Sequence, residues 1–207
     1  AGGGVVFQRK NKYGDETVKE RTKQSAARFF DQHKDLAHLK EPILKVCSML
    51  LETYRAGGKL LICGNGGSCA DAEHIVGELM KGFLLKRPLD EGLKDRFTHL
   101  FGDSGQAIAQ KLQTGLPAIA LDAHTALNSA FSNDVDADLV YAQQVIGYAK
   151  AEDLVLGIST SGNAKNVLYA LMAAKAKGAK SAALSGRDGG KLAKIADCCV
   201  VAPAEET

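Results

Sequence analysis

The chain has 207 residues, of which 45% are hydrophobic, and its 26 basic and 24 acidic side chains leave a formal net charge of +2. A chain of this length suits one α/β domain with added helices, and a domain of that size buries enough surface to fold without metal or disulfide staples. The balanced charge gives no bulk field that points to nucleic acid or membrane, and no apolar run approaches the roughly 20 residues of a membrane span.

The N-terminal part is predicted to be an arm followed by helices. Its opening residues, Ala-Gly-Gly-Gly-Val-Val-Phe, hold too little apolar sequence for a signal peptide. Apolar residues at loose helical intervals predict one helix from about Glu16, and a second from Pro42 to the Gly57-Gly58 pair. These helices could cover another subunit or only this domain's own sheet. We interpret residues 1–40 as an arm and oligomerisation helix, and residues 41–207 as the main domain.

The chain is organised around a buried strand, a glycine turn and a helix that begin at Leu60. The apolar run Leu60 to Cys63 is typical of a strand covered on both faces in a parallel sheet. The turn Gly64-Asn-Gly-Gly67 permits positive φ, and Ser68 is the expected N-cap of the helix. Backbone N–H groups and the dipole of this helix would suit a phosphate, although a glycine turn without a ligand is the simpler interpretation of one such loop alone.

Two better-known glycine loops are excluded by the residues that follow the turn. A P-loop needs Lys followed by Ser or Thr after its last Gly, and here Ser68 and Cys69 follow Gly67. The dinucleotide fingerprint needs a third small residue where Cys69 stands. A nucleotide-dependent enzyme is therefore disfavoured.

The helix after this turn carries two chemical groups. His74 and Glu78 are four residues apart, so their side chains project from one helix face. Such a pair can bind one divalent metal or serve as a base and its partner, whereas on an arbitrary helix it would be a surface pair. Because this helix begins at a predicted phosphate site, we favour the chemical interpretation.

Residues 83–116 are predicted to be a charged connection with one short helix from Ser104 to Leu112. A second strand, Pro117 to Leu121, follows it. A helical turn then leads to Asn133-Asp134, and a helix is expected from Ala137 to Ala149.

A second loop of the same design follows the third predicted strand, Leu154 to Ile158. It carries the hydroxyls of Ser159, Thr160 and Ser161 at another helix start. Ser and Thr at such a place are more often simple caps, but two such loops in one domain favour one shared phosphate pocket. Further strands at Ser181 to Leu184 and Cys198 to Ala202 complete a five-stranded parallel sheet, whose ligands gather at the carboxyl ends of the strands.

These features together resemble the sugar-isomerase (SIS) domain, and within it the sedoheptulose 7-phosphate isomerases, also called phosphoheptose isomerases. The resemblance runs from about Pro42 to the last residue, and it implies a flavodoxin-like, doubly wound α/β fold with helices on both faces of the sheet. It is carried by the residues Gly64 to Ser68, His74, Glu78, Asn133, Asp134 and Ser159 to Asn163.

The resemblance implies aldose–ketose isomerisation of a phosphosugar through an enediol, giving the heptose phosphate used for bacterial surface polysaccharide. Glu78 matches the catalytic acid/base, which also contacts substrate, and His74 and Glu78 match ligands of a metal, usually zinc. The substrate-binding positions of the family match Asn65, Gly66, Gly67, Ser68, Asn133, Asp134, Ser159, Thr160 and Ser161.

The sequence departs from the family in three places. The family continues into a helix with a Gln and a His, so the remaining zinc ligands and the second acid/base are expected beyond Thr207. Ala164 stands where the family often has Ser, and the charged insertion at 83–116 lengthens the path from Glu78 to the next strand. The last two differences leave the sugar itself open.

The alternative function is a non-catalytic phosphosugar-binding SIS protein with a regulatory or protein-binding role, and the presence of Glu78 favours the enzyme. The partners expected from the resemblance are a phosphorylated sugar and further copies of the chain, in a homotetramer with sites between subunits. Nucleic acid and membrane are not expected partners. The five cysteines show neither metal-ligand spacing nor a disulfide framework, which indicates reduced thiols in a cytoplasmic protein.

Overall fold

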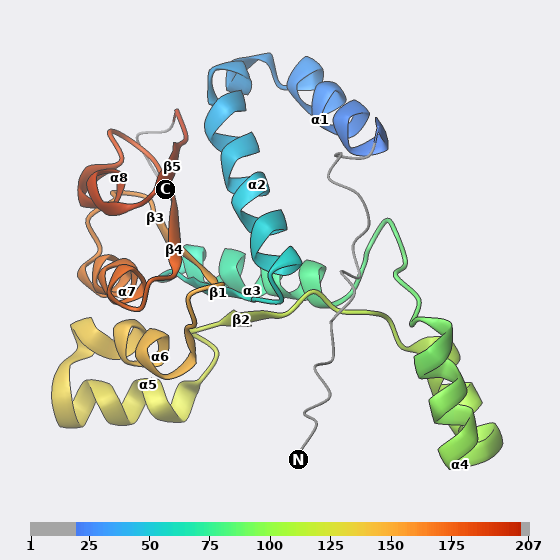
Figure 1. Ribbon diagram of the computed structural model, residues 1–207. Helices are drawn as coiled ribbons and strands as arrows, with labels where there is room; N and C mark the ends of the chain where they lie inside the picture. Colours follow the sequence, from blue (N-terminus) through green and yellow to red (C-terminus); the bar gives the residue numbers. More distant parts are fainter. Residues whose placement is uncertain (1–19, 204–207) are drawn as a thin grey trace, which may run out of the picture.

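The computed structural model describes residues 20–203, which form an α/β fold around one five-stranded parallel sheet (Figure 1). The predicted fold class is confirmed. Both ends of every strand lie within one residue of the bounds predicted from its apolar run. The strands are β1 (Leu60–Cys63), β2 (Ala118–Ala120), β3 (Leu154–Ser159), β4 (Lys180–Ser185) and β5 (Cys198–Val201).

Helices precede the sheet and connect its strands. Before β1 lie α1 (Glu20–Gln32), the 3-10 turn η1 (Lys34–Leu39) and α2 (Lys40–Arg55). Residues 1–19, which include the predicted start of the first helix at Glu16, lie outside the described residues. The connections contain α3 (Gly67–Met80), α4 (Glu91–Lys111), α5 (Thr125–Phe131), the π-helical turn η2 (Ser132–Asp136), the 3-10 turn η3 (Ala137–Leu139), α6 (Val140–Tyr148), α7 (Lys165–Ala176) and α8 (Gly190–Ile195).

The sheet separates two apolar cores, and β1 contributes to both. Alternate residues of a strand point to opposite faces. Leu61 and Cys63 therefore pack with residues of α6, α7 and α8, whereas Leu60 and Ile62 pack with residues of α2 and α3. All four residues are buried, which explains why this strand reads as a continuous apolar run.

The strand order β2-β1-β3-β4-β5 determines where a ligand can bind. From β1 the chain passes to β2 on one side and then returns to β3 on the other, so the order reverses between β1 and β3. Doubly wound sheets bind ligands beyond the carboxyl ends of the strands at such a reversal. The two predicted loops begin where β1 and β3 end, which places both at this point.

The segment around α4 differs most from its prediction. Instead of one short helix at 104–112, helical structure runs over Glu91–Lys111 and breaks at Gly102, where φ is 56° and ψ is −140°. Pro88 and Gln113 form an antiparallel bridge, so the two ends meet and the segment is a helical hairpin. In Figure 1 this hairpin projects from the body on the side away from α7 and α8.

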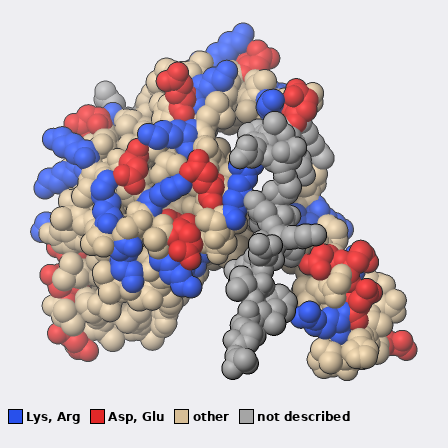
Figure 2. Space-filling view, viewed as in Figure 1, with Lys and Arg blue, Asp and Glu red and all other residues tan. Residues whose placement is uncertain are grey.

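The face of the described residues that Figure 2 shows carries charges of both signs. In Figure 2, basic and acidic side chains are interspersed over the body of the molecule, and the tip of the α4 hairpin is largely uncharged. The side chains of Leu100 and Phe101 at this tip are both 61% exposed. Among the helices of residues 20–203, none combines the length and apolar character that crossing a bilayer requires.

Candidate functional site

A cavity of about 370 Å³ opens at the reversal point between β1 and β3. This volume is within the range of small-molecule sites. Its lining joins both predicted loops, and seven of the predicted site residues take part in it. The lining residues are Asn65, Gly66, Gly67, Ser68, Ile158, Ser159, Thr160, Ser161, Ala164 and Arg187.

The first loop presents bare backbone to the cavity. The predicted N-cap at Ser68 is wrong, because Gly66 occupies that position with a φ of 57° and α3 begins at Gly67. Because glycine tolerates this left-handed φ, the helix can start before Ser68. A Cβ added at Gly66 or Gly67 would meet nothing within 4 Å, so open space lies against the helix start. This is the arrangement in which helix N-termini bind anions.

The second loop is held by the glycine turn that follows β4. Gly186 N–H donates to the Thr160 carbonyl at 3.0 Å, and the Ser185 hydroxyl donates to the Ser159 carbonyl at 2.8 Å. A Cβ on Gly162 would lie 2.0 Å from the Gly189 carbonyl oxygen, so the two backbones are in direct contact. The hydroxyl-bearing loop is therefore fixed before any ligand binds, which lowers the entropic cost of binding.

Asn65 is oriented by side chains from two distant helices. Its side-chain amide exchanges two hydrogen bonds with that of Asn166 on α7, at 2.9 and 3.0 Å. The Tyr141 hydroxyl of α6 donates to the Gly64 carbonyl at 2.7 Å and lies 3.2 Å from Asn65 Oδ1. Burial raises the pKa of Tyr141, so this hydroxyl keeps its proton at neutral pH. The network presents Asn65 to the cavity in one orientation.

The other predicted residues do not line the cavity of the described chain. His74 Nε2 lies 3.9 Å from Glu78 Oε1, and the two side chains are 77% and 49% exposed. Asn133 and Asp134 lie exposed on η2, where the Asn133 amide donates to the Asp134 carboxylate at 2.8 Å. The helix predicted from Ala137 begins only at Val140, because π-helical and 3-10 turns precede it.

A group of three possible metal ligands lies beside the first loop. Single ligand atoms of Cys69, Glu73 and Asp122 are all within 4.8 Å of one another. The Cys69 thiol donates to Asp122 at 3.0 Å, and this bond, with partial burial and the nearby carboxylates, raises the pKa of Cys69 to about 11. The thiol is therefore protonated at neutral pH, and metal binding there would have to displace that proton.

Among the residues of the site region that were not predicted from the sequence are Tyr141, Asn166 and Arg187. Tyr141 and Asn166 act on a residue 76 and 101 positions away, so no local pattern marks them. Arg187 had a weak signal, because it is the charged member of a glycine turn that follows a strand next to β3.

Comparison with known proteins gives a consistent result. Residues 26–96 and 117–207 each match a family model described as an SIS domain. The chain is 38% identical over 169 residues to a phosphoheptose isomerase of a Geobacter species, covering 82% of this chain and 74% of that protein. It is 37% identical over 174 residues to the phosphoheptose isomerase of Helicobacter pylori, covering 84% and 77%.

Solved structures agree with this comparison. The phosphoheptose isomerase of Neisseria gonorrhoeae matches with a TM-score of 0.65 and 30% identity, over 90% of this chain and 88% of that one. The phosphoheptose isomerase of Francisella tularensis matches with a TM-score of 0.66 and 24% identity, over 91% and 88%, and shows the same fold.

Proposed function

The chain belongs to the SIS-domain family, among the phosphoheptose isomerases, and we propose that it converts sedoheptulose 7-phosphate to a heptose 7-phosphate through an enediol. The observation that carries this proposal is the cavity at the reversal point, where a bare helix start and a hydroxyl loop converge. The same helix, α3, leads directly from that cavity to His74 and Glu78. Each copy of this helix thus carries a proposed phosphate-binding end and the proposed base.

In the proposed reaction Glu78 removes a proton from the carbon beside the carbonyl, and a hydrogen-bond donor or a cation stabilises the oxyanion that develops. The backbone of Gly66 and Gly67, with the hydroxyls of the second loop, would hold the phosphate and so orient the sugar. Asn133 and Asp134 are proposed to bind the sugar hydroxyls, for which amide and carboxylate groups are suitable partners.

We assign the proposed zinc ion to His74 and Glu78. The 3.9 Å between their ligating atoms is close to the separation of about 3.3 Å that two ligands have on a tetrahedral zinc, so a small side-chain rotation would let both bind. A catalytic zinc takes about three ligands from protein, and this pair would supply two of them. When bound, the ion would act as a Lewis acid towards the sugar carbonyl.

The proposed isomerisation predicts that the protein exchanges a substrate proton with solvent. We expect NMR to detect deuterium entering sedoheptulose 7-phosphate beside the carbonyl in deuterated water, while unphosphorylated sedoheptulose exchanges at a rate at least about tenfold lower, because it lacks the group that the cavity holds. The reaction is followed with and without added zinc. Phosphosugar binding without any exchange would instead indicate a sensor or scaffold.

We further propose a homotetramer in which the cavity of one subunit lies against the exposed site residues of another. In the described chain His74, Glu78, Asn133 and Asp134 all lie outside the cavity lining. The helices before the sheet also expose apolar side chains that a neighbour could cover. These are Phe29, Leu44 and Leu51, each 40–43% exposed. Both observations support a site completed by a second copy.

A shared site predicts that two inactive variants restore each other. Gly67→Leu should block the cavity without disturbing the fold, because a Cβ there meets nothing within 4 Å. Glu78→Gln removes the proposed base. In hybrids formed by co-expressing the two, about a quarter of shared sites would have both native residues, and about that fraction of activity should return. If each site lies within one chain, the hybrids should stay as inactive as their parents.

A further inference from the structure

The cavity has one charged group among its described lining residues, and that group is Arg187. The other residues present backbone, an amide, hydroxyls and two apolar side chains. Neutral donors can hydrogen-bond to a phosphate, but they do not balance its charge. A guanidinium does both, since its planar array of N–H groups matches the oxygens of a phosphate.

The backbone at Arg187 supports a role for its side chain. Its φ is 52°, and it is the one residue other than glycine with a positive φ in the range 20–203. Gly189 and Gly190 in the same turn also have positive φ. Glycine therefore occupies the other positions of this turn that have a positive φ, and Arg187 is the exception. A side chain kept at a sterically disfavoured position is typical of a functional site.

The turn also holds Arg187 in a fixed place relative to the hydroxyl loop. Gly186, immediately before it, is bonded to the Thr160 carbonyl at 3.0 Å. On the other side, the Asp188 carboxylate accepts from Gly190 N–H at 3.0 Å, which closes the turn. The backbone next to Arg187 is thus hydrogen-bonded to the loop that carries Ser159, Thr160 and Ser161.

From these observations we infer that Arg187 is the cation that recognises the phosphate of the substrate and so selects phosphorylated over unphosphorylated sugars. The inference rests on the proposed function, because it assigns a residue to the same cavity. Arg187 contacts the non-reacting end of the substrate, so its contribution is to binding and specificity rather than to the chemical step.

The test compares Arg187→Gly, Arg187→Lys and the control Lys194→Gln, which removes a cation of α8 that does not line the cavity. Glycine fits a positive φ, so Arg187→Gly should unfold at a temperature no lower than the native protein. Its KM for sedoheptulose 7-phosphate should rise about ten- to a hundredfold, the usual range for losing a charge-assisted bond, with kcat changed less than about threefold. Lysine should restore part of the loss.

The binding constant and the kinetic constants are measured separately, so this inference can be judged independently of the proposed function. Calorimetric binding of sedoheptulose 7-phosphate reports recognition even if no turnover occurs. Binding that weakens in Arg187→Gly, but not in Lys194→Gln, upholds the assignment whether or not the protein isomerises. An unchanged KM and binding constant in Arg187→Gly would overturn it, as would an equal loss in Lys194→Gln or a loss confined to kcat.

Discussion

Glu78→Gln should lower solvent proton exchange into sedoheptulose 7-phosphate by about 10²- to 10⁴-fold, the usual contribution of a general base. Glutamine keeps the shape of glutamate but cannot accept the proton. The fold should be unaffected, because the Glu78 side chain is 49% exposed and its contact with His74 at 3.9 Å is an exposed one of little energetic weight. The measurement is deuterium incorporation followed by NMR, with thermal unfolding recorded for the same samples.

The matched control is Asp71→Asn, an exposed carboxylate two turns earlier on α3. It removes the same charge from the same helix and should leave exchange within about twofold of the native rate, since distant surface charges are screened. If Glu78→Gln keeps more than about a tenth of the native exchange rate, another residue is the base.

Asp153→Ala should destabilise the protein by about 3–5 kcal/mol, the usual cost of breaking a buried ion pair. The Asp153 carboxylate is 1% exposed and binds the Lys59 ammonium at 2.6 Å. It also accepts the backbone N–H groups of Lys59 and Lys150, each at 2.8 Å. Removing it leaves a largely buried cation and two N–H groups without their acceptor, at the point where β1 and β3 begin.

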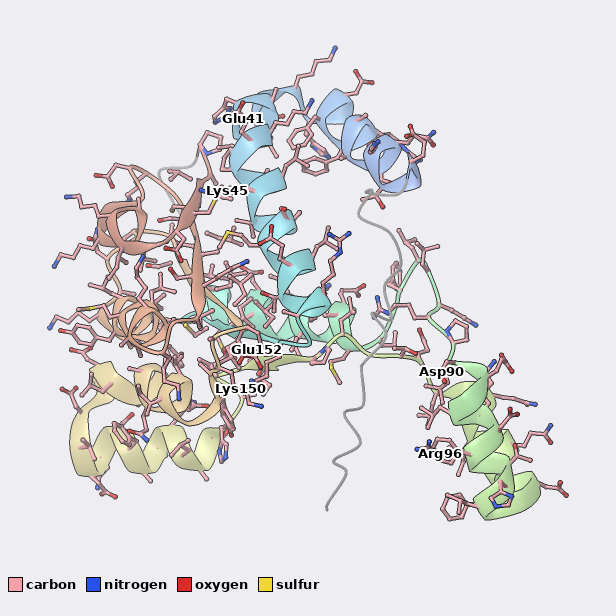
Figure 3. All side chains as sticks on the ribbon, in the orientation of Figure 1. Glu41, Lys45, Asp90, Arg96, Lys150 and Glu152 are labelled. Atoms are coloured by element: carbon pink, nitrogen blue, oxygen red, sulfur yellow. The ribbon has the colours of Figure 1, made fainter. Side chains whose placement is uncertain are left out.

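The loss can be measured by urea unfolding, from the midpoint and the slope of the transition. The control is Glu152→Ala, the preceding residue, which Figure 3 shows with Lys150 in the turn before β3. Because Glu152 is exposed, this variant should stay within about 0.5 kcal/mol of the native protein. A loss below about 1 kcal/mol for Asp153→Ala would mean that the ion pair and its hydrogen bonds contribute little.

The strands and both cavity loops could be predicted from the sequence because their signals are local. A buried parallel strand is a short apolar run, and a strand followed by glycines or hydroxyls marks its carboxyl end. The start of α3 was missed by two residues, because the N-cap is Gly66 and not Ser68, and no local pattern predicts the φ of 57° at Gly66. The expected roles of His74, Glu78, Asn133 and Asp134 remain predictions.

The α4 hairpin was missed because long-range packing overrides its local pattern. Glycine lowers helix propensity, so the sequence around Gly102 does not predict helical structure on both sides of it. In the fold, however, Gly102 makes the break itself, and Gly105 lets the two segments approach so closely that a Cβ would lie 2.0 Å from the Phe97 carbonyl oxygen. The Asp90 side chain caps the first segment by accepting from Leu93 N–H at 3.0 Å, a signal that could have been used (Asp90 is labelled in Figure 3).

The closed base of this hairpin makes it a separable module. Thr114 N–H donates to the Arg87 carbonyl, and Pro88 bridges Gln113, so the chain enters and leaves the hairpin at almost the same place. Residues 97–116, which include its second segment, fall between the two stretches that match the family. A lineage could therefore gain, lose or exchange this module without altering the register of the sheet.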